Sequence, residues 1–194
     1  MFQRLSLTIA KHMVSDQIIL ENQIAVYKYG LELALSSIAG ILALVVVSVL
    51  CAEPFWWLPY LVGFIPIRLL GGGYHAKSHS SCISLFTLFY VISFIGIKYY
   101  TISAVVWMLI CAFDVFVQFV FAPVEANNKP LRAVQRNINR YRCLLLGILN
   151  LFFSVMFSYL QVNCPTWVTL YFAGSSMASV SIMLAVIIKN IRKE

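Results

Sequence analysis

Long apolar segments separated by short polar ones make up most of the chain. The segments are Leu31–Ala52, Pro54–Leu70, Ile83–Ile97, Tyr100–Phe121, Leu144–Leu160 and Thr166–Ile188. A helix needs about 20 apolar residues to cross a bilayer, and the first, fourth and sixth segments clearly reach this length. The second and third are shorter, and the second contains Pro54, Pro59 and Pro66, which favour kinks. The pattern predicts an all-α polytopic membrane protein with about six transmembrane helices, the two short ones either crossing fully or forming a re-entrant hairpin.

The first 30 residues have a different pattern. Charged and apolar residues alternate there at helical spacing: Ile9, Met13, Ile18 and Ile19 are apolar, and Arg4, Lys11, Asp16 and Glu21 lie between them. A signal peptide would have a continuous apolar core instead. We therefore expect residues 1–30 to contain an amphipathic helix, either on the membrane face or packed on the rest of the protein. Residues 31–194 are expected to form a single transmembrane helical domain.

The composition agrees with a membrane protein. Hydrophobic residues make up 61% of the chain and charged residues 11%, and the mean hydropathy is +0.88. Soluble domains carry about 25% charged residues. One small core could not hide this much apolar surface from water, so the lipid bilayer must be the solvent.

The basic residues indicate the orientation. If the N-terminus is cytoplasmic and the chain crosses six times, Lys98 is the only one of the 14 Lys and Arg residues outside. Both termini, segment 68–82 and a basic loop at 122–143 then face the cytoplasm. The net charge of +7 is thereby explained by topology, and no nucleic-acid partner is expected. The basic loop is expected to contact anionic lipids of the inner leaflet.

The stretch RLLGGGYHAKSHSSC, residues 68–82, contains several potentially catalytic residues and lies between the two short spans. It holds three consecutive glycines, two of the three histidines and a cysteine. A nearby base makes a thiol a nucleophile. On one helix His75 and Cys82 would lie about 10.5 Å apart along the axis, so pairing them requires a turn, whereas His79 could reach Cys82 within a helix. The residues alone do not choose between the histidines.

Other interpretations compete with a catalytic thiol. The glycines could be only a hinge, and the histidines only interfacial polar groups. His75, His79 and Cys82 could bind a metal, although a fourth ligand is missing. Five cysteines without a repeating spacing do not indicate a disulfide framework. Asp114, an acid inside the fourth segment, could orient a polar network or mark an ion pathway, which makes a small transporter an alternative.

Two motifs resemble the accessory gene regulator B (AgrB-like) family. The first is Arg68, then Gly72-Gly73-Tyr74-His75-Ala76, then Cys82. The second is Ala122-Pro123, then Lys129-Pro130 and a basic stretch ending at Tyr141. Members of this family are bacterial membrane cysteine peptidases that process precursors of cyclic quorum-sensing peptides. The likeness extends to length and multi-spanning layout, and it is specific in these two segments.

The resemblance implies a function and a site. His75 would be the catalytic base and Cys82 the nucleophile, cleaving a short precursor peptide through a thioester that an internal Cys or Ser resolves into a ring. The backbone of Gly71, Gly72 and Gly73 is the candidate oxyanion site. Candidates for contacting the precursor are Arg68, Glu125 and Lys129. No cofactor or metal is expected, the location is the bacterial cell membrane, and a second copy of the chain is a candidate partner.

Overall fold

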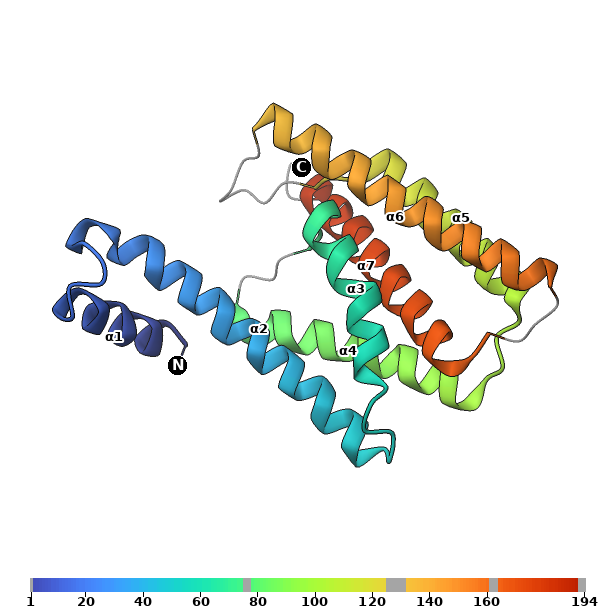
Figure 1. Cartoon of the computed structure of the whole chain (residues 1–194), viewed down its shortest axis with the longest axis horizontal. Helices are drawn as coiled ribbons and strands as arrows, with labels where there is room; N and C mark the ends of the chain where they lie inside the picture. Colours follow the sequence, from blue (N-terminus) through green and yellow to red (C-terminus); the bar gives the residue numbers. More distant parts are fainter. Residues whose placement is uncertain (1, 75–77, 125–131, 161–163, 192–194) are drawn as a thin grey trace.

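The computed structural model describes residues 2–74, 78–124, 132–160 and 164–191. These residues contain seven α-helices and no β-strand, which confirms the all-α prediction (Figure 1). The helices are α1 (Phe2–Ser15), α2 (Ile24–Leu50), α3 (Trp57–Gly71), α4 (His79–Tyr99), α5 (Ala104–Phe121), α6 (Ala133–Tyr159) and α7 (Thr166–Ile191), with a 3-10 turn at Glu21–Gln23 before α2.

Each predicted apolar segment coincides with one of the helices α2 to α7. Five stretches are long and apolar enough to cross a membrane: Glu21–Leu50, Ser80–Tyr99, Ala104–Phe121, Ala133–Tyr159 and Thr166–Ile191. The remaining apolar helix, α3, has 15 residues. The chain is therefore a multi-pass membrane protein.

The two segments that looked weak in sequence differ in the structure. The third segment is not short, because α4 has 21 residues. It gains its first turn from Ser78, the N-cap, whose hydroxyl accepts a hydrogen bond from the Ser81 N–H; serine favours this position. In α3, Pro54 precedes the helix, and Pro59 lies in the first turn, where no backbone donor is needed. Pro66 alone interrupts the helix interior.

Helix α3 is held mainly by α7, the helix against which it packs most extensively. Glycines allow this approach: a methyl group on Gly63 would strike the Tyr171 carbonyl, and one on Gly174 would strike the Tyr60 carbonyl. Small residues let helix backbones come close in membranes. One face of the short helix therefore packs on protein, against α7 and α6, while Leu58, Val62 and Leu69 on other faces are exposed.

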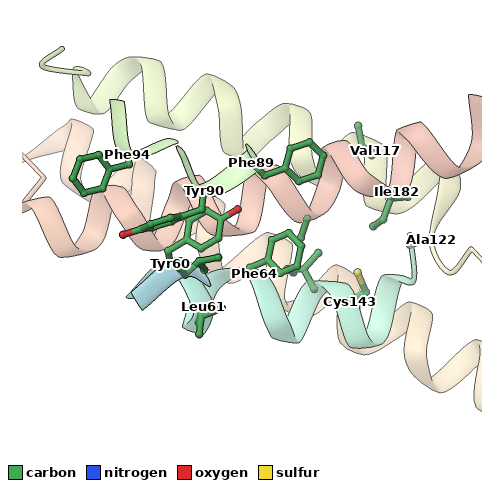
Figure 2. Close-up of a cluster of buried hydrophobic side chains, with 13 residues drawn as sticks. Tyr60, Leu61, Phe64, Phe89, Tyr90, Phe94, Val117, Ala122, Cys143 and Ile182 are labelled. Atoms are coloured by element: carbon green, nitrogen blue, oxygen red, sulfur yellow. The ribbon is translucent and has the colours of Figure 1, made fainter. Parts of the chain in front are cut away.

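An aromatic cluster fills the space between α3 and α4. Figure 2 shows Tyr60 and Phe64 of α3 facing Phe89, Tyr90 and Phe94 of α4. The ring centroids of Tyr60 and Tyr90 are 5.0 Å apart in an edge-to-face arrangement, a favourable geometry for aromatic pairs. The Tyr90 hydroxyl also forms a hydrogen bond with Ser48 of α2. The cluster therefore joins α2 to α3 and α4, the two helices that flank the glycine-rich segment.

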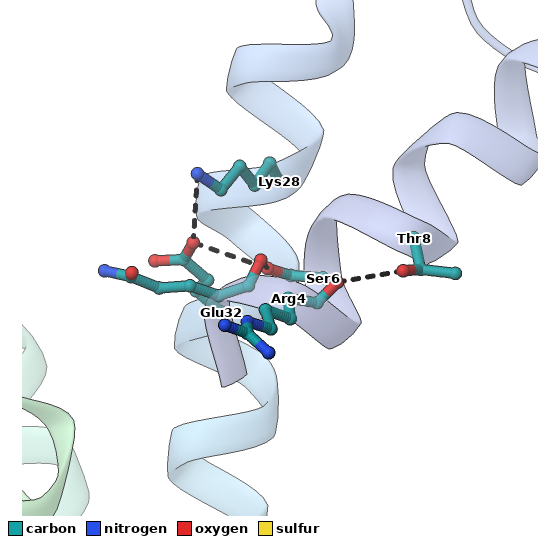
Figure 3. Close-up of polar contacts among 6 residues, drawn as sticks. Arg4, Ser6, Thr8, Lys28 and Glu32 are labelled. Atoms are coloured by element: carbon teal, nitrogen blue, oxygen red, sulfur yellow. Dashed lines mark hydrogen bonds and ion pairs between the residues drawn. The ribbon is translucent and has the colours of Figure 1, made fainter. Parts of the chain in front are cut away.

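The N-terminal helix α1 folds back along the start of α2, away from the α5–α7 bundle (Figure 1). Its buried residues Ser6 and Ala10 lie on one face, while Arg4 and Lys11 are exposed. Figure 3 shows the polar contact: the Ser6 hydroxyl donates to Glu32 of α2 over 3.3 Å, and Lys28 pairs with the same carboxylate at 3.7 Å. The predicted amphipathic helix is present and packs on the protein.

Candidate functional site

The glycine run forms a sharp turn at the end of α3. Gly71 is the last helical residue, and the two that follow have positive φ angles, +73° at Gly72 and +138° at Gly73. Residues with side chains rarely adopt such angles. Gly71 is constrained by space instead, because a methyl group there would lie 2.6 Å from Ile182 Cδ1 and 3.1 Å from Cys143 Sγ. Gly72 and Gly73 are therefore favoured by their backbone conformation, and Gly71 by its close packing against α6 and α7.

The turn is fixed from one side by the chain that follows α5. The Val124 N–H donates to the Gly71 carbonyl over 2.9 Å, and Gly72 and Val124 form an isolated parallel bridge. Val124 follows Ala122-Pro123, whose peptide bond is cis. The two motifs that carry the family resemblance, about 50 residues apart in the chain, thus touch each other.

From the other side, Arg68 and Ser181 hold the turn. The Arg68 guanidinium donates through Nη1 to the Ser181 hydroxyl over 3.2 Å and through Nη2 to the Tyr74 carbonyl. The Tyr74 N–H in turn donates to the Ser181 carbonyl over 2.9 Å and lies 3.3 Å from its hydroxyl oxygen. Helix α3, the turn and α7 are joined in a closed set of hydrogen bonds.

Cys82 lies at the start of α4, at the same end of the molecule. Its N–H donates to the Ser78 carbonyl over 3.1 Å, and the residue is partly exposed. The structure joins Arg68 to the glycine turn through the Tyr74 carbonyl and places Cys82 in the first turns of the helix that follows. His75, Glu125 and Lys129 lie outside the described residues.

The other four cysteines are placed differently. Cys111 and Cys143 are buried inside the bundle, 1% and 0% exposed. Cys51 and Cys164 lie at the opposite end, where Lys98 donates to the Cys51 carbonyl over 2.8 Å. Burial raises the pKa of the Cys164 thiol. All five cysteines are free, and Cys82 is the one that is both accessible and beside the turn.

A cavity of about 530 Å³ opens beside the second motif. Its apolar side comes from residues 120–123, and its polar side from Arg136, Asn137 and Arg140 of α6. The Arg140 guanidinium is held over the Phe119 ring, 5.6 Å from its centroid, and donates to the Phe119 carbonyl over 3.1 Å. Arg136 and Arg140 give the polar side of this cavity a positive charge.

A second polar region lies in the middle of the bundle. Asp114 of α5 accepts a 2.7 Å hydrogen bond from the Ser176 hydroxyl, and Gln118 donates to Ser179 over 3.2 Å. Asn150 of α6 donates to Ser175 over 2.8 Å. Asp114 thus contributes a hydrogen bond between α5 and α7, and its role in a polar network or an ion pathway stays a prediction. Among the described residues, no group of three His, Cys, Asp or Glu could hold a metal ion; the metal hypothesis involves His75.

These features define a class: multi-pass helical membrane proteins with a cysteine beside an arginine-braced glycine turn at one end of the bundle. The model of one family, accessory gene regulator B, matches residues 6–191, nearly the whole chain, and the protein belongs to that family. No curated protein and no solved structure matches the chain. Membership implies a part in quorum-sensing peptide processing.

Sequence reasoning missed Ser181, Val124 and the cavity arginines as parts of this end of the molecule. Ser181 lies 113 residues from Arg68, in an apolar helix with several serines, and nothing in its local pattern distinguishes it. Arg132, Arg136 and Arg140 carried a usable signal, because a spacing of four places them on one helix face. Sequence reasoning assigns them to topology, to lipid contact and to the second motif, but not to a cavity.

Proposed function

We propose that the protein is a membrane-embedded cysteine endopeptidase that cleaves a short signalling-peptide precursor and promotes its cyclisation. The observation that carries this proposal is the position of Cys82. Its sulfur-bearing side chain is partly exposed at the end of the bundle where Arg68 braces the glycine turn. Cys111 and Cys143 are buried. Compared with these two buried thiols, the Cys82 thiol is better placed to meet a peptide substrate.

The reaction needs two acyl transfers. His75 removes the Cys82 proton, and the thiolate attacks a backbone carbonyl of the precursor. The backbone of Gly71–Gly73 stabilises the oxyanion. The carbon–nitrogen bond then breaks, His75 returns its proton to the leaving amine, and the N-terminal fragment stays on Cys82 as a thioester. A thiol or hydroxyl within that fragment attacks the thioester, loses its proton to His75 and releases Cys82, which closes a thiolactone or lactone.

The surroundings of Cys82 support the first step. The start of a helix carries a partial positive charge from its unpaired N–H groups, and Cys82 lies at the start of α4. Arg68, on the helix that precedes the turn, adds a positive charge to this part of the chain. The thiolate is the nucleophilic form of cysteine. Transfer of an acyl group between two sulfurs is close to thermoneutral, so the reaction needs no ATP.

The precursor is proposed to reach this end of the molecule from the cytoplasm, where the basic residues place it. Both termini of the chain are then cytoplasmic. The cavity with Arg136 and Arg140 lies beside Val124, which pairs with the turn. It offers a place for an acidic part of the peptide; Glu125 and Lys129, further candidate contacts, lie outside the described residues. A bound, folded-back peptide favours ring closure over hydrolysis, since its own nucleophile is held near the thioester.

The proposal is tested by removing single thiols. Cys82→Ala should lower precursor cleavage in proteoliposomes by at least about 10³-fold, because loss of a nucleophile removes the covalent route. Cys143→Ala and Cys111→Ala are matched controls, since both thiols are buried in the same bundle, and both variants should keep processing the precursor. Cleavage by the Cys82→Ala variant at the rate of the controls would refute the thiol mechanism.

A further inference from the structure

The hydroxyl of Ser181 is used in an unusual way for a serine inside a helix. Hydroxyls of helical serines commonly donate to a carbonyl of their own helix, as Ser179 does to Ser175 over 3.3 Å and Ser93 does to Phe89 over 2.9 Å. The Ser181 oxygen instead lies 3.2 Å from Arg68 Nη1 and 3.3 Å from the Tyr74 nitrogen. It is an acceptor aimed at two donors outside its helix, and the residue is 3% exposed.

The two donors, the Arg68 guanidinium and the Tyr74 N–H, belong to a hydrogen-bond network around the Tyr74 backbone. Arg68 bridges the Ser181 hydroxyl and the Tyr74 carbonyl, and the Tyr74 N–H is held by the Ser181 carbonyl. Both polar groups of the Tyr74 backbone are therefore fixed, directly or through Arg68, by one residue of α7. The next residue in the chain is His75.

The space around this arrangement is filled. A methyl group on Gly73 would collide with the Arg68 guanidinium and would lie 2.8 Å from the Ser181 hydroxyl oxygen. The third glycine of the run is therefore required by the Arg68–Ser181 contact as well as by its positive φ angle.

We propose that Ser181 is a positioning residue for the processing reaction: its hydroxyl holds Arg68 against the Tyr74 carbonyl, and this fixes the backbone of the glycine turn, the candidate oxyanion site. The inference rests on the proposed function, because it assigns the turn a part in the reaction. Without the hydroxyl, Arg68 keeps its charge but loses one of the two points that orient it. The N–H groups of the turn then meet the oxyanion less often in a productive geometry.

The test compares Ser181→Ala with Ser179→Ala in full-length protein reconstituted in proteoliposomes. Ser179 is a matched control, because it is buried on the same helix but its hydroxyl binds Gln118. Small misplacements of reacting groups cost about 10²-fold in rate, so Ser181→Ala should lower kcat by about 10- to 100-fold with KM changed by less than about 3-fold. Ser179→Ala should keep kcat within about 2-fold. Equal kcat values for the two variants would overturn the inference.

A second variant keeps the test independent of folding. Arg68→Lys retains the charge but lacks the planar fork that reaches two acceptors at once. If Ser181 acts through Arg68, adding Ser181→Ala to Arg68→Lys should lower kcat by less than about 2-fold further, whereas independent roles would multiply the two losses. Multiplied losses would contradict the inference. Cys82→Ala is measured in parallel: if it retains cleavage, the proposed function fails, and if it is inactive while Ser181→Ala is fully active, only the role of Ser181 fails.

Discussion

Ser181 and two serines that precede it in α7, Ser175 and Ser179, are similarly buried but bind different kinds of partner. Ser175 and Ser179 bind side chains of neighbouring membrane helices, Asn150 and Gln118. Ser181 binds an arginine and the backbone of a non-helical segment. The first set joins helix to helix, and the second joins a helix to a turn.

The difference indicates how one helix supports two tasks. In a membrane, backbone outside a helix must have its polar groups satisfied by protein, and the turn after α3 obtains this from Ser181, Arg68 and Val124. The mid-bundle network has no such segment to hold. We therefore expect changes at the turn to alter the rate of processing and changes in the middle of the bundle to alter stability.

Among single substitutions at or near the turn, we expect the largest loss of processing rate at His75. His75→Ala should lower kcat by about 10²- to 10⁴-fold, the range for loss of a general base, while His79→Ala should keep most of the activity. The rates are compared by mass spectrometry of the processed precursor. A metal site would need both histidines and Cys82, and chelators would inhibit it. Equal losses of activity at both histidines, with recovery on adding zinc, would therefore favour a metal centre over the thiol–imidazole pair.

In the middle of the bundle we expect a smaller effect, on stability and not on rate, at Asn150. This buried side chain donates to Ser175 and accepts a 2.7 Å hydrogen bond from the Tyr171 hydroxyl. Asn150→Leu should lower the free energy of unfolding in mixed micelles by about 1 kcal/mol, as interhelical hydrogen bonds in membranes do, with kcat of the folded protein unchanged. The lipid-facing change Ile148→Leu on the same helix is the control. A loss of kcat without a loss of stability would break the contrast.

Much of the fold could be predicted from the sequence, because each membrane helix is a long apolar run. The start of α4 was misjudged because Ser80 and Ser81 are weak helix formers, whereas Ser78 caps the helix through its hydroxyl. Ser78, two and three positions before these serines, was the signal that the helix begins there. The candidate site, the glycine turn with Arg68 and Cys82, was proposed from its unusual composition between apolar spans, and that proposal stays a prediction.

The supports of the site could not be predicted, because they come from distant parts of the chain. The Arg68–Ser181 contact depends on the close packing of α3 and α7, which Gly63 and Gly174 permit. No local pattern specifies which helices will approach. Val124 is likewise brought to Gly72 by tertiary structure. Local sequence predicts where polar chemistry gathers, and packing decides which residues hold it in place.

The most direct test of the central claim, a covalent thiol mechanism at Cys82, is to trap its intermediate. The protein is incubated with a precursor whose internal Cys or Ser nucleophile is replaced by alanine, and its mass and modified peptide are determined. The account predicts an adduct of the N-terminal precursor fragment on Cys82 that hydroxylamine removes and that Cys82→Ala abolishes. Cleavage of this precursor with no adduct, or with an adduct on another residue, would contradict the account.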